Sequence, residues 1–269
     1  MLRLLSFDPF RSAGISGVTY VKPELVLDEK DRILSADWLL FPEYWQVNFL
    51  SYGWKKRIFP SLSSYHLGHD KVEMTRALQA VMPEHVPDTL IAANKEDIKE
   101  KICERFSYPF VAKEVRSSMG KGVFLISSAA DLDRYLAAND TVYIQEYLAI
   151  DRDIRVVFVG RNAVAAYWRV GRDGFKNNVA QGGTIDFSAV PRDVIDLVER
   201  VCRTLGIDHA GFDIALVDGH PYFFEFNVLF GTQALTEAGI SLGSVIYDYL
   251  LGLSSTEPPK PELPAPKAS

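Results

Sequence analysis

Three oxygen-bearing side chains, Asp213, Glu225 and Asn227, lie in a stretch that otherwise consists mostly of apolar residues. The pattern predicts two short strands joined by a tight turn at Asp218-Gly219, with the three side chains near the strand ends at the edge of a core. Asp, Glu and Asn supply the oxygen ligands that Mg²⁺ prefers, and Mg²⁺ often shares its shell with phosphate groups. An ordinary hairpin with solvated polar residues is the alternative.

A lysine lies inside a predicted strand upstream of this hairpin. Residues 110–115 are mostly apolar, so burying Lys113 among them is costly unless a partner offsets its charge. A loop of small residues follows at 117–122, before a second strand over 123–126. Glycine-rich loops let backbone N–H groups approach a phosphate closely, although a plain glycine hairpin has the same composition.

Opposite charges alternate on a predicted strand over 153–159, which follows another predicted strand over 141–147. Asp153 and Arg155 are two residues apart and therefore face the same side of that strand. Arg169 lies on the strand that returns after a turn at 160–162. A solvated ion pair is one interpretation, but arginines beside carboxylates also suit the binding of a phosphate or carboxylate group.

Helices and strands alternate along the chain, which predicts a mixed α/β fold. Residues 1–66, with strands near 37–42 and 57–60, form a small α/β unit in this interpretation. Apolar periodicity and capping residues predict helices from about 70 to 82, 95 to 106, 128 to 139, 191 to 205 and 242 to 251. A loop rich in amides and glycine, 171–183, is a candidate lid.

The composition argues against several classes of protein. The 269 residues are 48% hydrophobic and 24% charged, which is typical of a folded globular protein. A net charge of −6 and the lack of a Lys/Arg-rich tract argue against nucleic-acid binding. Cys103 and Cys202 lack metal or redox spacing, which favours free thiols. No secretory signal or membrane-length apolar run is visible, so we expect a cytoplasmic protein without a membrane partner.

In chain order, the chemically notable residues resemble the ATP-grasp superfamily, and most closely the RimK-type carboxylate–amine ligases. The similarity covers about residues 68–250 and ends in an Asp…Glu-x-Asn signature. It implies an α/β (α+β) ATP-grasp fold in which the nucleotide is held between two α+β subdomains, after a small N-terminal α/β domain. The implied boundaries are 1–66 and 67–252 (smaller subdomain about 86–147, larger catalytic part about 148–252). The proline-rich, apolar-poor composition of 253–269 predicts a disordered tail.

The resemblance also implies which residues contact the nucleotide. Those matching its phosphate, adenine and ribose positions are Lys71, Lys113, Ser117, Ser118, Gly120, Gly122, Gln145, Glu146, Tyr147, Asp153, Lys176 and Asn178. Arg155 and Arg169, with Lys113, match the positions that stabilise the transferred phosphoryl group or orient a substrate carboxylate. Asp213, Glu225 and Asn227 match the ligands of one or two Mg²⁺ ions, with Mn²⁺ as an alternative.

The implied activity is that of an ATP-dependent ligase, which activates a carboxylate as an acyl phosphate and joins it to the amine of an amino acid or peptide. A nucleotide-binding protein without turnover and a small-molecule kinase on the same fold are the alternatives. Oligomeric state, including a homo-oligomer, is left open. Three departures from the family pattern concern the substrate side: Phe230 replaces the usual proline before Gly231, the loop begins Ser-Ser-Met-Gly, and Lys176 stands where arginine is frequent.

Overall fold

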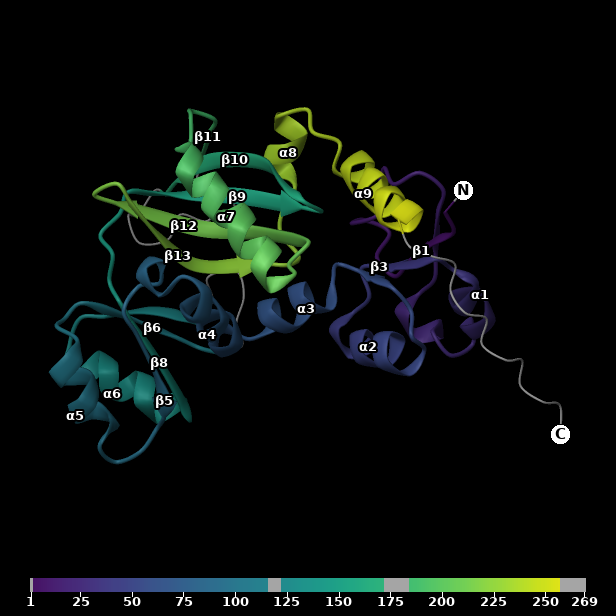
Figure 1. The fold of residues 1–269 in the computed structure, drawn as a ribbon. Helices are drawn as coiled ribbons and strands as arrows, with labels where there is room; N and C mark the ends of the chain where they lie inside the picture. Colours follow the sequence, from purple (N-terminus) through teal and green to yellow (C-terminus); the bar gives the residue numbers. More distant parts are fainter. Residues whose placement is uncertain (1, 116–121, 172–183, 257–269) are drawn as a thin grey trace, which may run out of the picture.

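A computed structural model of the chain describes residues 2–115, 122–171 and 184–256, which contain three β-sheets flanked by helices (Figure 1). The predictions for Ser117, Ser118, Gly120, Lys176 and Asn178, and for most of the 171–183 loop, lie outside these residues. Within the described part of the chain, no helix has both the length and the apolar character needed to cross a membrane.

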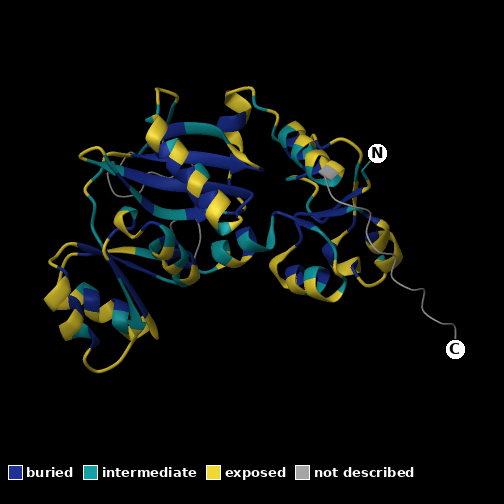
Figure 2. Ribbon diagram, viewed as in Figure 1, coloured by how far each residue is buried: buried dark blue, intermediate teal, exposed yellow. Residues whose placement is uncertain are grey.

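The N-terminal sheet has the order β2-β1-β3-β4, and its pairings are all parallel. Its strands are β1 (Leu4–Ser6), β2 (Val18–Tyr20), β3 (Trp38–Leu40) and β4 (Ile58–Phe59). The flanking helices are η1 (Pro23–Leu25), α1 (Lys30–Ser35), α2 (Tyr44–Asn48), η2 (Phe49–Gly53) and α3 (Leu62–His69). Parallel strands are covered on both faces, so β1 and β3 are continuous buried runs (Figure 2). The predicted strands near 37–42 and 57–60 are confirmed.

Helix α9 (Leu242–Thr256) covers one face of this N-terminal sheet, although it comes last in the sequence. Ile246 and Leu250 share an apolar cluster with Trp38, and Trp38 Nε1 donates a hydrogen bond to Ser254 Oγ at 3.0 Å. The predicted tail boundary at 253 is therefore wrong. The helix continues to Thr256 because its last turn is held against the sheet.

A four-stranded antiparallel sheet follows, with the order β5-β8-β6-β7. It contains β5 (Thr89–Ala93), β6 (Phe110–Lys113), β7 (Val123–Ile126) and β8 (Thr141–Glu146), with α5 (Ile98–Arg105) and α6 (Ala129–Ala138) on one face. Phe110 and Ala112 pack under these helices. Because side chains alternate along a strand, Lys113 belongs to the opposite face.

The third sheet is five-stranded and antiparallel, with the order β11-β10-β9-β12-β13. Its strands are β9 (Arg152–Val159), β10 (Asn162–Val170), β11 (Thr184–Asp186), β12 (His209–Val217) and β13 (His220–Asn227). Helices α4 (Lys71–Val81) and α7 (Arg192–Leu205) pack on one face; η3 (Pro83–His85) and α8 (Gln233–Glu237) complete the fold. Asp218 and Gly219 both have positive φ, as the predicted tight turn requires.

A buried carboxylate joins this sheet to the N-terminal unit. Asp208 Oδ1 accepts a hydrogen bond from the backbone N–H of Ser61 at 2.7 Å and another from the Ser64 hydroxyl at 3.2 Å. Ser61 caps α3, so the carboxylate lies at the start of that helix. The contact orients the end of β4 toward the first residues of β12.

Candidate active site

Four charged side chains form a buried network on the five-stranded sheet. Arg169 binds Asp153 through two contacts, Nε to Oδ1 at 2.7 Å and Nη2 to Oδ2 at 2.8 Å. Asp213 Oδ1 lies 2.6 Å from Arg155 Nε and 3.0 Å from Arg169 Nη2. Cross-strand register places Arg155 opposite Asp213 and Arg169 opposite Asp153. The predicted alternative of a solvated pair between Asp153 and Arg155 is wrong, because each residue pairs across strands and all four are buried.

Two groups of this network, Asp153 and Arg169, have pKa values that are shifted by burial and by their partners. Burial raises the pKa of Asp153 to about 6 despite the adjacent Arg169, which leaves the carboxylate charged at pH 7. Burial opposes the charge of Arg169, but Asp213 and Asp153 together hold the Arg169 pKa above its usual range. The network is thus two buried ion pairs that orient both arginines before any ligand binds.

The predicted metal residues lie beside this network. Asp213 on β12 is the register partner of Glu225 on β13, and the Asn227 amide is 3.4 Å from Glu225 Oε1. Asp213 Oδ1 is buried without an aligned hydrogen-bond donor, although the two arginines neutralise its charge. Two carboxylates and one amide oxygen on one sheet face are a donor set that fits Mg²⁺.

No cluster of three or more His, Cys, Asp or Glu side chains able to hold a metal occurs in residues 2–115, 122–171 and 184–256. A cation at Asp213 and Glu225 would therefore need Asn227 and further oxygen ligands. Phosphate oxygens and water commonly complete the shell of Mg²⁺. The protein ligands alone form an open site rather than a closed metal cage.

Lys113 reaches this region from the four-stranded sheet. It is buried, with Nζ donating to Gln145 Oε1 at 2.7 Å. The ammonium group lies 5.5 Å from the ring centroid of Tyr143 and 5.8 Å from that of Phe224 on β13. Burial, together with the nearby charge of Lys71, lowers the pKa of Lys113 to about 8, although Glu225 and Asp213 oppose the shift. Lys113 is thus positioned between the two antiparallel sheets.

The remaining predicted nucleotide residues flank Lys113. Lys71 begins α4, is buried, and donates its backbone N–H to Val115 O at 3.3 Å, just after β6. Gln145 is buried and donates to Thr89 Oγ1 at 2.9 Å, so its amide holds Lys113 in place. The next two residues, Glu146 and Tyr147, are half-buried at the end of β8.

Of the two glycines in the predicted 117–122 loop, Gly122 lies within the described residues. Its φ is +72°, a backbone region that favours glycine. The Glu114 N–H donates to Gly122 O at 2.8 Å and brings together the two ends of the 115–122 segment. Glu114 and Gly122, which flank this part of the chain, therefore lie together next to the ends of β6 and β7, close in sequence to Lys113.

An aromatic cluster that the sequence did not predict lies near Arg155. The His209 ring stacks on Phe230 with centroids 4.6 Å apart and meets Phe59 edge-on at 5.2 Å. Its Nδ1 lies 2.8 Å from Val228 O, and burial lowers the His209 pKa to about 3, so the ring is neutral. A Cβ at Gly211 would lie 2.5 Å from Arg155 Nη1 and 3.1 Å from Phe230 Cβ. Nothing in local sequence periodicity signals this cluster.

Phe230→Ala is expected to destabilise the fold by about 3–5 kcal/mol, because a buried aromatic ring is lost and a cavity remains. Urea denaturation should show this change. Leu229→Ala is the matched control. The Leu229 side chain neighbours Phe230 in the sequence but is exposed, so its loss should cost far less unfolding free energy. Equal losses in the two variants would contradict the role of Phe230 as a core residue.

The comparisons with known proteins agree with this geometry. Residues 69–250 match the family model of the RimK-like ATP-grasp domain. A probable alpha-L-glutamate ligase from Enterobacter sp. (strain 638) is 30% identical over 72% of this chain and 70% of its own length. The ribosomal protein bS6–L-glutamate ligase of Salmonella paratyphi B is 31% identical over 66% of this chain and 64% of its own length.

Among solved structures, D-alanine–D-alanine ligase from Bacillus anthracis superimposes with a TM-score of 0.72 at 15% identity, over 95% of this chain and 98% of that one. The same ligase complexed with ATP gives a TM-score of 0.70. The mixed α/β architecture and the ATP-grasp fold are thereby confirmed. The chain belongs to the RimK-like ATP-grasp family, and its reaction class is the ATP-dependent ligation of a carboxylate to an amine.

Proposed function

We propose that the protein phosphorylates a peptide or amino-acid carboxylate with ATP and joins the acyl phosphate to the amine of an amino acid. The observation that carries this proposal is that Lys113, from one sheet, lies beside Phe224 of another sheet and interacts electrostatically with Glu225 and Asp213, the carboxylate that pairs with Arg155 and Arg169. Phosphoryl transfer depends mainly on positioning and charge neutralisation. Three cations beside a carboxylate pair are suited to that task.

The proposed reaction has two steps, formation of the acyl phosphate and formation of the amide. A substrate carboxylate oxygen bonds to the γ-phosphorus of ATP, and the bond from that phosphorus to the bridging β–γ oxygen breaks, releasing ADP. The amine nitrogen then attacks the acyl carbon, the bond to the phosphate oxygen breaks, and the departing phosphate takes up the amine proton. In this proposal Lys71 and Lys113 neutralise the ATP phosphates. Arg155 and Arg169 stabilise the transferred phosphoryl group.

The proposed metal residues are Asp213, Glu225 and Asn227, which would hold Mg²⁺, or Mn²⁺ in its place. Bound there, the ion would supply positive charge to the phosphates of ATP. Glu146 and Tyr147 would contact the adenine, and Asp153 the ribose. Asp153 also positions the Arg169 guanidinium, through its bidentate contact with that side chain. The domain boundaries predicted above, apart from the corrected tail, and a cytoplasmic location belong to the same proposal.

The names of the relatives suggest the first substrates to test. Because two relatives are named as L-glutamate ligases, we take L-glutamate as the amine and a peptide C-terminus as the carboxylate. Purified protein with Mg²⁺-ATP, L-glutamate and a peptide library should release ADP and yield peptides heavier by one glutamyl residue in mass spectrometry. ADP release without any amide product, or a phosphate ester in its place, would contradict the proposal.

The apparent KM for ATP is expected to rise above pH 8. The pKa of Lys113 is about 8 in the folded protein, against an ordinary lysine value of 10.5, so its charge is lost as pH rises through 8. Burying the charged Lys113 lowers the free energy of unfolding by its full amount below pH 8. This loss of stability decreases as the pH rises from 8 to 10.5. Steady-state kinetics from about pH 7 to 9.5 should show KM for ATP approaching about a tenfold rise per pH unit.

Lys113→Arg is the control for this pH dependence, because a guanidinium stays protonated throughout that range. Its KM for ATP, whatever the absolute value, should be independent of pH over the same interval. The same rise in Lys113→Arg as in the wild type would assign the titration to another group.

A further inference from the structure

The carboxyl edge of the N-terminal sheet meets the five-stranded sheet. In parallel α/β sheets, ligands bind beyond the carboxyl ends of the strands. Here Phe41 follows β3 and Phe59 ends β4, and both rings pack edge-on against His209 of β12. The segment after β1 lies at the same edge and carries Arg11, a charged residue that no part of the proposed mechanism uses.

Arg11 is tied directly to the segment that follows the metal-face residues. Its Nη1 donates to the carbonyl oxygen of Phe230 at 3.1 Å, and Phe230 comes three residues after Asn227. Phe230 Cβ in turn lies beside Gly211, where Arg155 Nη1 also approaches. Phe230 and Gly211 therefore connect Arg11 to the arginine that we assign to phosphoryl transfer.

Asp8 holds Arg11 in a defined orientation. Asp8 Oδ1 accepts the backbone N–H groups of Phe10 at 2.9 Å and Arg11 at 3.0 Å, while Oδ2 lies 3.5 Å from Arg11 Nε. The Arg11 side chain nevertheless remains 30% exposed. A guanidinium carries five N–H donors in a planar fork, and these side-chain contacts engage only two of its nitrogens. The group is held in place and still has donors for an anionic ligand.

We propose that Arg11 determines substrate specificity by binding a carboxylate group of the amine substrate. This inference rests on the proposed ligase function. The carboxylate that is activated must lie at the phosphoryl group, beside Arg155 and Arg169, so an anion at Arg11 is a second group. An amino acid supplies such a group on the same molecule as its amine. The guanidinium fork matches the two oxygens of a carboxylate.

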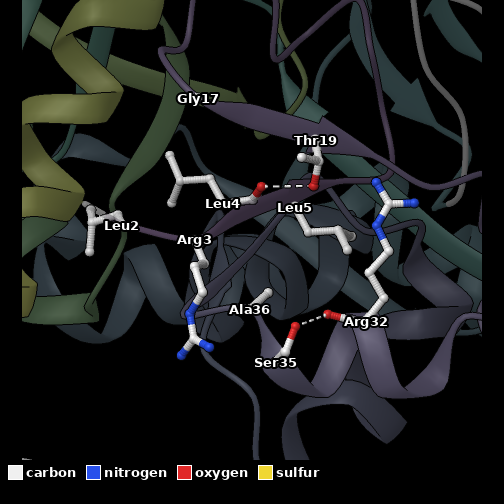
Figure 3. A pocket seen from close by; sticks show the side chains of 9 residues that line it. All are labelled: Leu2, Arg3, Leu4, Leu5, Gly17, Thr19, Arg32, Ser35 and Ala36. Atoms are coloured by element: carbon white, nitrogen blue, oxygen red, sulfur yellow. Dashed lines mark hydrogen bonds between the residues drawn. The ribbon is translucent and has the colours of Figure 1, made fainter.

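The opposite edge of the same sheet provides a matched comparison. A cavity of about 330 Å³ lies there, between the starts of β1 and β2 and the end of α1, with Arg3 and Arg32 in its lining (Figure 3). Each arginine pairs with an aspartate, Arg3 with Asp37 at 2.9 Å and Arg11 with Asp8 at 3.5 Å. Arg3 and Arg11 thus lie at opposite ends of β1, and only Arg11 contacts the segment after β13.

The test compares three amines in the ligation assay: L-glutamate, L-glutamine and L-isoglutamine. The two amides each replace one carboxylate of L-glutamate. The wild type should use at least one amide with a higher KM than L-glutamate. Arg11→Gln should raise the KM for L-glutamate by about ten- to a hundredfold, the range for a charge-assisted hydrogen bond, with kcat unchanged. For the amide that the wild type uses with a higher KM than L-glutamate, the KM of Arg11→Gln should be nearly the same as that of the wild type. Arg3→Gln should behave as the wild type with all three amines.

Two results would overturn this role for Arg11, and they are distinguishable from failure of the ligase proposal. A rise in KM that is equal for all three amines, or a loss of kcat alone, would mean that Arg11 only bridges to Phe230. If Arg11→Gln does not fold, Arg11→Lys replaces it, and the ratio of its KM for the amide to its KM for L-glutamate is measured. A ratio below that of the wild type supports the role of Arg11, and a ratio equal to that of the wild type opposes it. A wild type that condenses none of the three amines would instead contradict the proposed function, and the role of Arg11 with it.

Discussion

Glu225→Gln is expected to abolish Mg²⁺-dependent ADP formation while leaving the protein folded. Glu225 is half-buried on β13, opposite Asp213, and contributes one of the two carboxylates of the proposed metal site. Glutamine keeps the shape and removes the charge. Outer-shell changes at metal sites already cost about 10–100-fold in affinity or activity, so loss of a direct ligand should cost at least about a hundredfold.

ADP release, measured over a Mg²⁺ titration, checks this expectation, with circular dichroism to confirm the fold. Glu237→Gln is the matched control, because Glu237 is an exposed glutamate on α8. The control should keep wild-type activity. Wild-type activity in Glu225→Gln at low Mg²⁺ would show that the metal assignment is wrong.

Arg169→Leu is expected to cost about 3–5 kcal/mol of unfolding free energy and to remove ligase activity. The substitution leaves two buried carboxylates, Asp153 and Asp213, without the guanidinium that binds both. An uncompensated buried charge accounts for most of the cost of breaking such a pair. Guanidinium denaturation at neutral pH measures the loss.

Arg192→Leu is the control, since Arg192 forms an ion pair of similar length with Asp196 at 2.8 Å but is 72% exposed. Exposed pairs contribute about 0–1 kcal/mol, so this variant should be nearly as stable as the wild type. Acidification should narrow the difference in unfolding free energy between Arg169→Leu and the wild type. Burial raises the pKa of Asp153 to about 6, and below that pH the protonated Asp153 no longer needs the guanidinium. A difference that stays constant from about pH 7 to pH 4 would contradict the explanation.

Strand and helix positions were largely predictable where a local signal was strong. The apolar face of α7, its end at Gly206, the cap of α6 at Ser128 and the turn at Asp218-Gly219 follow from residue type and spacing. Short elements such as β5 and α3 escaped prediction. Their sequences carry weak periodicity, and they are stabilised by partners far away in the chain.

The sequence by itself determined the chemical inventory: the Asp…Glu-x-Asn signature, the lysine in β6 and the order of residues that marks an ATP-grasp protein. Only the tertiary structure decided the pairing. Arg169 bridges Asp153 and Asp213, α9 returns to the first sheet, and Phe230 packs on His209 between Arg11 and Arg155. The physical reason is that residue type and spacing act within one or two turns of chain. These contacts depend instead on strand register and on burial between sheets, which are properties of the whole fold.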